Sequence, residues 1–222
     1  SDHKFLFKIP RNYYPDIDTS PMMEILRSWV PESDIPFIIQ PVAQALVQMM
    51  TGGQLKKATL LQGQKNGAKS TCINFIESFL GNLLSERASL TELCNDKNIG
   101  GKLENKLLCS TEELKDTKLT NTDTFKGLVG DGRHRIERKF EQSYTGFLYC
   151  TYLFACNAPP KIDDDTKNDS AWWERWNYVV FPYFYETNVA FRQKLFTEPY
   201  FEQYLKLVVD MVLEIVKNGY RL

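Results

Sequence analysis

The spacing of apolar residues along the chain predicts an alternation of helices and strands. Within a proline-rich first stretch, apolar residues recur at helical spacing over Met22 to Trp29 and over Phe37 to Met50, and Gly52-Gly53 ends the second run. Lys57 to Gln62 then has the pattern of a buried strand, and Ser70 to Leu84 that of a helix. These patterns predict a small helical lead-in followed by a strand, turn and helix.

The rest of the chain continues this alternation. Glu92 to Lys106 is polar and has no clear period, whereas the later segments predict a strand at Lys106–Ser110, a helix at Thr122–Leu128, two hairpin strands at Arg135–Phe140 and Phe147–Cys156, a strand at Asn177–Phe184 and a helix at Asn188–Asn218. We therefore expect an α/β fold with a central, mostly parallel sheet, an inserted β-hairpin and helical segments at both ends. The expected division is a helical lead-in over 1–56, a core over 57–185 and a C-terminal helical segment over 186–222.

Nine residues join the first predicted strand to its helix: Gly63, Gln64, Lys65, Asn66, Gly67, Ala68, Lys69, Ser70 and Thr71. They fit the phosphate-binding pattern GxxxxGK[ST], except that Ala68 stands where the second glycine is usual. In such a loop backbone N–H groups hold phosphate, the lysine neutralises its oxygens and the hydroxyl binds Mg²⁺. Alanine is tolerated there at negative φ and strained in a left-handed conformation, which Gly67 would partly relieve. The alternative is a turn with an incidental Lys-Ser pair.

Polar residues also follow two later strands. Glu112 and Glu113 follow an apolar run, where one carboxylate would hold Mg²⁺ and the other would orient or deprotonate water; we assign Glu112 to the metal, with Ser70, and Glu113 to the water. Asn157 ends the run Leu153 to Cys156, from which its amide would reach a γ-phosphate or that water. The alternatives are acidic residues at a helix start and a turn-capping asparagine.

Two further groups of residues carry positive charge. Arg175 lies in a tryptophan-rich cluster, where it would either stack on indole rings or act on a neighbouring subunit's γ-phosphate. The most basic segment contains Lys126, Arg133, Arg135, Arg138 and Lys139, with Tyr144 and Phe147 nearby. It is either a solvated charged face or a hairpin that contacts a nucleic-acid backbone, with the aromatic rings stacking on unpaired bases.

Composition restricts these interpretations. The 222 residues have a net charge of −1, so a polyanion site has to be local. No apolar run suits a membrane span, and no basic-then-apolar leader is visible. The five cysteines have no CxxC spacing and favour reduced core thiols, and with only two histidines a zinc site is disfavoured.

Taken in order, these elements resemble the superfamily 3 helicases of viruses, phages and plasmids, in particular the helicase modules of phage-, plasmid- and poxvirus-type primase-helicases. The likeness extends from Phe37 to Tyr185. It rests on the loop and on motifs at Gly101-Lys102, Glu112-Glu113, Lys126 to Gly130-Asp131, Asn157 to Pro160 and Trp173 to Trp176.

The resemblance implies an AAA+-like P-loop ATPase core, a hexameric ring with ATP and Mg²⁺ between subunits, and 3′-to-5′ movement on single-stranded DNA. It further implies a replicative helicase associated with a primase, inside a prokaryotic host or at a viral replication site. Two alternatives stay open: a DNA-stimulated ATPase that does not unwind, and a DNA-binding or assembly module whose nucleotide site has decayed at Ala68.

Overall fold

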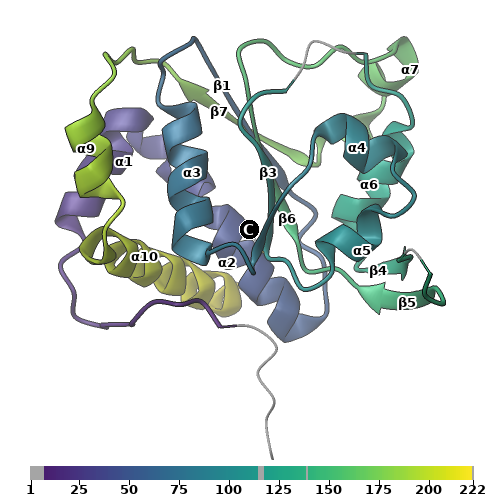
Figure 1. Cartoon of the computed structure of the whole chain (residues 1–222), viewed down its shortest axis with the longest axis horizontal. Helices are drawn as coiled ribbons and strands as arrows, with labels where there is room; N and C mark the ends of the chain where they lie inside the picture. Colours follow the sequence, from purple (N-terminus) through teal and green to yellow (C-terminus); the bar gives the residue numbers. More distant parts are fainter. Residues whose placement is uncertain (1–7, 115–117, 139, 222) are drawn as a thin grey trace, which may run out of the picture.

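The computed structural model describes residues 8–114, 118–138 and 140–221. Helices and strands alternate along most of the chain (Figure 1). In chain order the elements are α1 (Ser20–Trp29), the 3₁₀ turn η1 (Glu32–Asp34), α2 (Ile35–Thr51), β1 (Ala58–Gly63), α3 (Lys69–Leu80), β2 (Ser85–Arg87), α4 (Leu90–Asn95), α5 (Ile99–Leu103), β3 (Leu108–Thr111), α6 (Thr122–Gly130), β4 (Arg133–Ile136), β5 (Tyr144–Phe147), β6 (Thr151–Cys156), α7 (Asp164–Lys167), α8 (Ser170–Trp173), β7 (Trp176–Phe181), α9 (Val189–Leu195) and α10 (Glu198–Lys217).

Five strands form one parallel sheet in the order β2-β3-β6-β1-β7. Every residue of β6 is buried, as expected for a central strand that is covered on both faces. Because β1 pairs in parallel with both β6 and β7, the carboxyl ends of these strands lie at one edge of the sheet. The fold therefore brings Gly63, Cys156 and Phe181, which end the three strands, to the same edge.

Two layers of helices cover the sheet (Figure 1). On one face α1, α2, α3 and α10 share a core in which Phe75 of α3 makes edge contacts with Trp29 of α1 and Tyr204 of α10. On the other face α4, α5, α6 and α8 share a second core around Phe125. Helices from the two ends of the chain thus pack in one core with α3, while the division into three parts stays a prediction.

The expected α/β fold, with a parallel central sheet, an inserted hairpin and flanking helices, is confirmed. The details of the hairpin are not as predicted: β4 pairs antiparallel with β5, and β6 belongs to the central sheet. The apolar run over 147–156 is thus divided by Leu148, Tyr149 and Cys150 into the end of one strand and the whole of another. The single helix expected over 188–218 is two helices, because Pro199 lies in the first turn of α10 and a new helix begins there.

Six short elements were not predicted: η1, β2, α4, α5, α7 and α8. Strand β2 has only three residues, and α4 begins with a capping box in which Ser89 and Glu92 bond to each other's backbone N–H groups. No helix within the described residues has both the length and the apolar character needed to cross a membrane.

Candidate functional site

The chain packs closely against β7 and the segment after it at two glycines, Gly63 at the end of β1 and Gly67 in the loop. A Cβ atom at Gly63 would lie 2.5 Å from the Phe181 carbonyl oxygen, and one at Gly67 would lie 3.3 Å from that of Tyr183. The chain beyond β7 also bonds to the loop, since the Tyr185 N–H donates to the Asn66 carbonyl at 2.9 Å. The backbone that follows β7 therefore packs against the loop and is hydrogen-bonded to it.

Ala68 occupies the strained position of this loop. Its φ is +69°, in the left-handed region, which costs a residue with a Cβ atom about 1–2 kcal/mol. Asn66 is also left-handed, with φ of +63°, whereas Gly67 is not among the positive-φ residues. The prediction that Gly67 would relieve the strain at Ala68 is therefore wrong. Gly67 allows the loop to pack closely against the segment after β7, and Ala68 itself adopts the strained left-handed conformation.

Lys69 opens α3 with its side chain folded back under the loop. Its Nζ donates to the carbonyl oxygens of Gly63 and Gln64, both at 2.7 Å, and to the Asn157 Oδ1 at 3.1 Å. The residue is only 6% exposed, and this burial lowers the pKa of the ammonium. All three N–H donors of the ammonium thus have an acceptor within a largely desolvated pocket floor.

Asn157 connects this lysine to a carboxylate. Its Oδ1 accepts from Lys69, while its Nδ2 donates to the Glu113 Oε1 at 3.3 Å. The amide follows β6 and the carboxylate follows β3, which are adjacent parallel strands. The structure therefore brings Lys69, Asn157 and Glu113 together, and Ser70 and Glu112 line the same pocket.

Glu112 is held by a residue that sequence reasoning missed. Arg87, at the end of β2, pairs with Glu112 at 2.7 Å and with Glu77 of α3 at 2.5 Å. The same guanidinium bonds to Asn74 at 2.6 Å, so two of its partners come from the helix that follows the loop. Recognising Ser85 to Arg87 as a strand beside β3 would have placed the arginine here, but three polar residues give no strand pattern.

A pocket of about 880 Å³ opens over these residues. One wall is the loop and the strand ends, and the opposite wall comes from α1 and from the segment after β7. This second wall, which the motifs did not indicate, is formed by Glu24, Ile25, Ser28, Trp29, Tyr185, Glu186, Thr187, Asn188, Phe191 and Arg192. The Tyr185 hydroxyl donates to the Ser28 carbonyl oxygen and so joins the two segments.

The oxygen-bearing side chains in the pocket suit a metal ion that is also bound to phosphate. Among the described residues, no cluster of three or more His, Cys, Asp or Glu side chains is arranged to hold a metal by itself. Mg²⁺ is usually held by one or two carboxylates, with phosphate oxygens and waters completing the shell. The exposed Ser70 and Glu113 line the pocket, as does the partly exposed Glu112, and these three residues fit that requirement.

Arg175 lies at the amino ends of the parallel strands, on the opposite side of the sheet from the pocket. It immediately precedes β7, and its carbonyl accepts from the Ala58 N–H at the start of β1. Its guanidinium donates to the carbonyl oxygens of Lys126, at 3.1 Å, and Ala171. The side chain is thus bonded to two backbone carbonyls and lies apart from the candidate residues that line the pocket.

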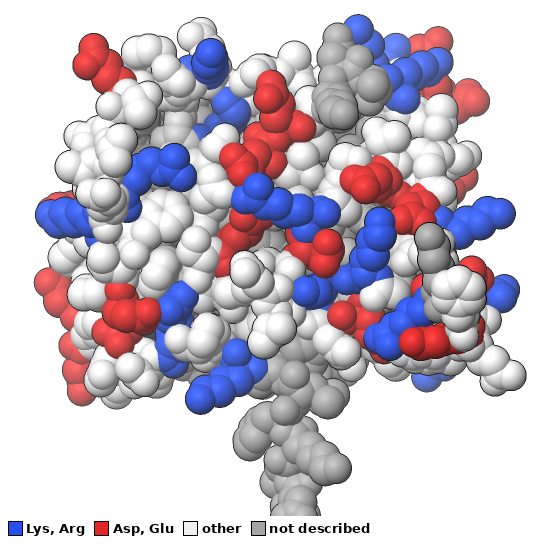
Figure 2. Space-filling model, in the orientation of Figure 1, with Lys and Arg blue, Asp and Glu red and all other residues white. Residues whose placement is uncertain are grey.

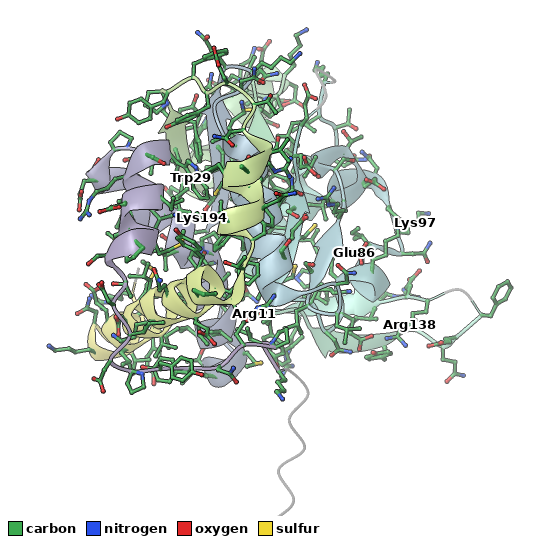
Figure 3. All side chains as sticks on the ribbon, turned by 60° about the vertical axis from the view of Figure 1, so that its left-hand side comes forward. Arg11, Trp29, Glu86, Lys97, Arg138 and Lys194 are labelled. Carbon is green, nitrogen blue, oxygen red and sulfur yellow. The ribbon has the colours of Figure 1, made fainter. Side chains whose placement is uncertain are left out.

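The candidate nucleic-acid residues lie at or near the hairpin, which directly precedes β6 at this same edge. Figure 3 shows Arg138 on the hairpin far from Trp29 of the pocket. Most of these residues have acidic partners in the described structure: Lys126 with Asp123 and Asp169, Arg135 with Glu137, Arg138 with Glu104 and Glu141, and Tyr144 with Glu104. Arg133 lies over the Phe147 ring instead, and Lys139 lies outside the described residues.

The fold is similar to that of solved structures of the NrS-1 C-terminal region. Two apo structures described as its A form align with TM-scores of 0.61 and 0.59 at 14% identity, over 90% and 88% of this chain. A third, of residues 305–718, aligns with a TM-score of 0.55 at 15% identity over 92% of this chain. This chain spans about half of their length, 46–47%. At this level of identity the similarity establishes the fold alone.

No curated protein matches the sequence. A protein-family model described as a family of unknown function, DUF5906, matches residues 61–175, from the phosphate-type loop to Arg175. That match spans more than half of the chain, and the chain is therefore a member of the DUF5906 family.

Proposed function

We propose that this chain is an ATP-hydrolysing motor module, a replicative DNA helicase of the superfamily 3 type that moves on single-stranded DNA. The observation that carries the proposal is the line of contacts from Lys69 through Asn157 to Glu113 at the edge of the pocket. A buried ammonium, a bridging amide and an exposed carboxylate are the groups that triphosphate hydrolysis requires, and they converge from three different elements.

The proposed role of Lys69 is to bind the β- and γ-phosphates. Two of its three donors bond to loop carbonyls without a nucleotide, and phosphate oxygens would replace these acceptors. The ammonium is largely desolvated, so its attraction for a phosphate is stronger than that of a surface lysine. Backbone N–H groups at the start of the 12-residue helix α3 add favourable dipoles.

The proposed role of Glu113 is to orient and deprotonate the attacking water. Its carboxylate is exposed and accepts a single hydrogen bond among those found in the described structure, from Asn157. Glu112 and Ser70 would hold Mg²⁺, which supplies charge neutralisation on the phosphates. Because Arg87 also pairs with Glu112, that arginine sets how much negative charge the metal site receives.

The second wall of the pocket gives room for the nucleoside. Ile25, Tyr185 and Phe191 are partly buried and present apolar surface opposite the loop. ATP bound with its phosphates at Lys69 would extend its base toward this wall. Apolar walls with a few polar groups are the usual surroundings of a bound cofactor or substrate ring.

Assembly completes the proposal. Arg175 would act on the γ-phosphate of a neighbouring subunit in a hexameric ring, after exchanging its bonds to Lys126 and Ala171 for that contact. The hairpin would face the DNA in the central channel. We further propose that the module works beside a primase, inside a prokaryotic host or at a viral replication site.

Strand displacement tests this function. The chain is incubated with MgATP and a forked duplex that carries a labelled strand, and ATP turnover is followed with and without single-stranded DNA. We expect DNA to stimulate turnover and the labelled strand to be released, and both to be lost with Lys69→Ala. Stimulated turnover without strand release would leave a DNA-stimulated ATPase, and DNA binding with no turnover would contradict both.

A second candidate is a DNA-binding or assembly module that no longer hydrolyses ATP. The left-handed Ala68 favours it, because the loop takes its shape only with a strained residue at the position where glycine is usual. This candidate predicts nucleotide binding without turnover. Restoration of turnover by Ala68→Gly would identify that residue as the cause.

A further inference from the structure

We propose that Arg133, Phe147 and Tyr149 form a platform on which the bases of single-stranded DNA stack. These residues, called the stacking platform below, lie where the β4–β5 hairpin meets the body of the protein. The inference rests on the proposed function only for the choice of single-stranded DNA. It assigns the base contacts to the foot of the hairpin and not to the charges near its tip.

Among the described residues near the tip, Arg135 and Arg138 have acidic partners. Arg135 pairs with Glu137 at 2.7 Å, and Arg138 pairs with Glu104. Figure 2 shows acidic and basic side chains interleaved over this corner of the molecule. A phosphate backbone that approaches the tip meets carboxylates as well as guanidinium groups, which weakens the electrostatic attraction expected from the sequence.

Arg133 is different from these arginines. In the described part of the chain no carboxylate pairs with it, and its guanidinium lies 5.3 Å from the centre of the Phe147 ring. The residue is exposed to solvent. A guanidinium stacked on an aromatic ring offers a flat surface to a base and a charge to the adjacent phosphate.

The aromatic part of the platform is already arranged for stacking. The rings of Phe147 and Tyr149 are nearly parallel, at an angle of 4°, with centroids 6.1 Å apart. Phe147 is 37% exposed, a large fraction for a phenylalanine. Stacked bases interact favourably with such faces whatever their identity, since each base has a π-face.

Hydrogen bonds from α2 and from the segment that follows it hold the backbone of the platform in place. The Gln48 side chain donates to the Tyr149 carbonyl at 3.1 Å, and Gln54 donates to the Leu148 carbonyl at 2.9 Å. Gln48 is completely buried and is itself bonded by Gln44 at 3.0 Å. These bonds fix the backbone that carries Phe147 and Tyr149, which reduces the part of the entropic cost of binding that comes from ordering this backbone.

Close packing at Gly132 points to the same conclusion. A Cβ atom there would lie 3.0 Å from the Phe147 ring and 3.1 Å from the Gln54 amide, so a larger residue would displace the ring. The Gly132 carbonyl also accepts from the Leu148 N–H at 2.9 Å. The residue before β4 and the residue after β5 are therefore joined by a hydrogen bond and pack closely next to the platform.

The experiment compares two labelled oligonucleotides of equal length by fluorescence anisotropy, a (dT)₂₀ strand and a strand of abasic sites, without nucleotide and over a salt series. We expect the chain to prefer (dT)₂₀, and Phe147→Ala and Tyr149→Leu each to weaken binding of (dT)₂₀ about 5- to 100-fold, with affinity for the abasic strand unchanged. Arg133→Gln should weaken both and lower the salt slope by about one, whereas Arg27→Gln, at the exposed ion pair with Glu32, should change neither by more than about twofold.

Phe147→Leu controls for misfolding, because leucine keeps most of the apolar volume and lacks the planar ring. We expect it to weaken (dT)₂₀ binding as Phe147→Ala does and to leave the melting temperature unchanged. Equal affinity of wild type for the two strands would overturn the platform. The proposal would also be overturned if the platform variants changed the particle size measured by light scattering and kept the preference for (dT)₂₀ over the abasic strand, since the platform would then be a protein interface. The binding assay contains no ATP, so a failure of the motor proposal appears separately, as absent turnover.

Discussion

The Lys69 ammonium and the Asn157 side-chain oxygen lie 3.1 Å apart, although 88 residues separate them in the chain. The contact joins the helix after the loop to the end of the central strand β6. Because the same amide also bonds to Glu113, one asparagine links the phosphate-binding group to the proposed water-activating group. Asn157 is therefore in a position to affect turnover more than nucleotide binding.

Asn157→Ala should lower kcat for ATP about 100-fold and leave nucleotide affinity within about threefold. The substitution removes the amide that positions Glu113 and leaves the Lys69 donors to phosphate in place, and the loss of one positioned polar group typically costs this much. Steady-state kinetics with a separate nucleotide-binding titration measure both quantities. Asn168→Ala, which removes an exposed amide that donates to the Asp164 carbonyl, is the matched control. An equal loss of binding and turnover would contradict the proposed role.

Arg87→Gln should lower the Mg²⁺ concentration needed for half-maximal ATP turnover. The substitution removes the positive charge that pairs with Glu112, so that the carboxylate is more available to the metal. Arg87 is 57% exposed, so the effect should be small, about 3- to 10-fold, as for other solvent-screened pairs. A Mg²⁺ titration measures it, with Arg27→Gln at the surface pair with Glu32 as control. An unchanged or higher Mg²⁺ requirement would show that Glu112 does not act on the metal.

Ala68→Gly should leave the free energy of unfolding unchanged or raise it by up to about 1 kcal/mol. Glycine removes the left-handed strain at φ +69°, and its extra freedom in the unfolded chain offsets part of this gain. Ala190→Gly, at an exposed position of α9, should instead lower stability by about 0.5–1 kcal/mol. Urea unfolding of both variants measures the contrast. Equal destabilisation by the two substitutions would contradict the strain at Ala68.

At pH 8 the thiols should react with alkylating reagents only after unfolding. The described structure has five free, buried cysteines, and burial raises the pKa of Cys94 and of Cys156 to about 11. At pH 8 the reactive thiolate is therefore a minor form, and reactivity should rise only as the pH approaches these values. Thiol titration in native buffer and in denaturant checks this; rapid reaction of native protein at pH 8 would contradict it.

The features predictable from sequence are those encoded by local pattern. The buried strands and the loop with Lys69 have clear signatures, because a glycine-rich turn after an apolar run indicates a specific geometry. Glu113 and Asn157 could be expected near Lys69 since both follow strands, and parallel strands end at one edge of the sheet. The free, buried cysteines also agree with the expected core thiols.

The features that could not be predicted depend on contacts between distant segments. Arg87 lies in a three-residue strand that exists because it pairs with β3, and nothing local marks it. The pocket wall from α1 and the segment after β7 forms only once both pack over the loop. The neutralisation of Arg138 by Glu104 likewise joins elements that are 34 residues apart.

The proposed hydrolytic site is best tested by measuring ATP hydrolysis and nucleotide binding by wild type, Lys69→Ala and Glu113→Gln. We expect that wild type turns ATP over, that Lys69→Ala loses nucleotide affinity, and that Glu113→Gln binds nucleotide normally while its turnover falls at least about 100-fold. No turnover by wild type, or the same residual turnover in all three proteins, would contradict it.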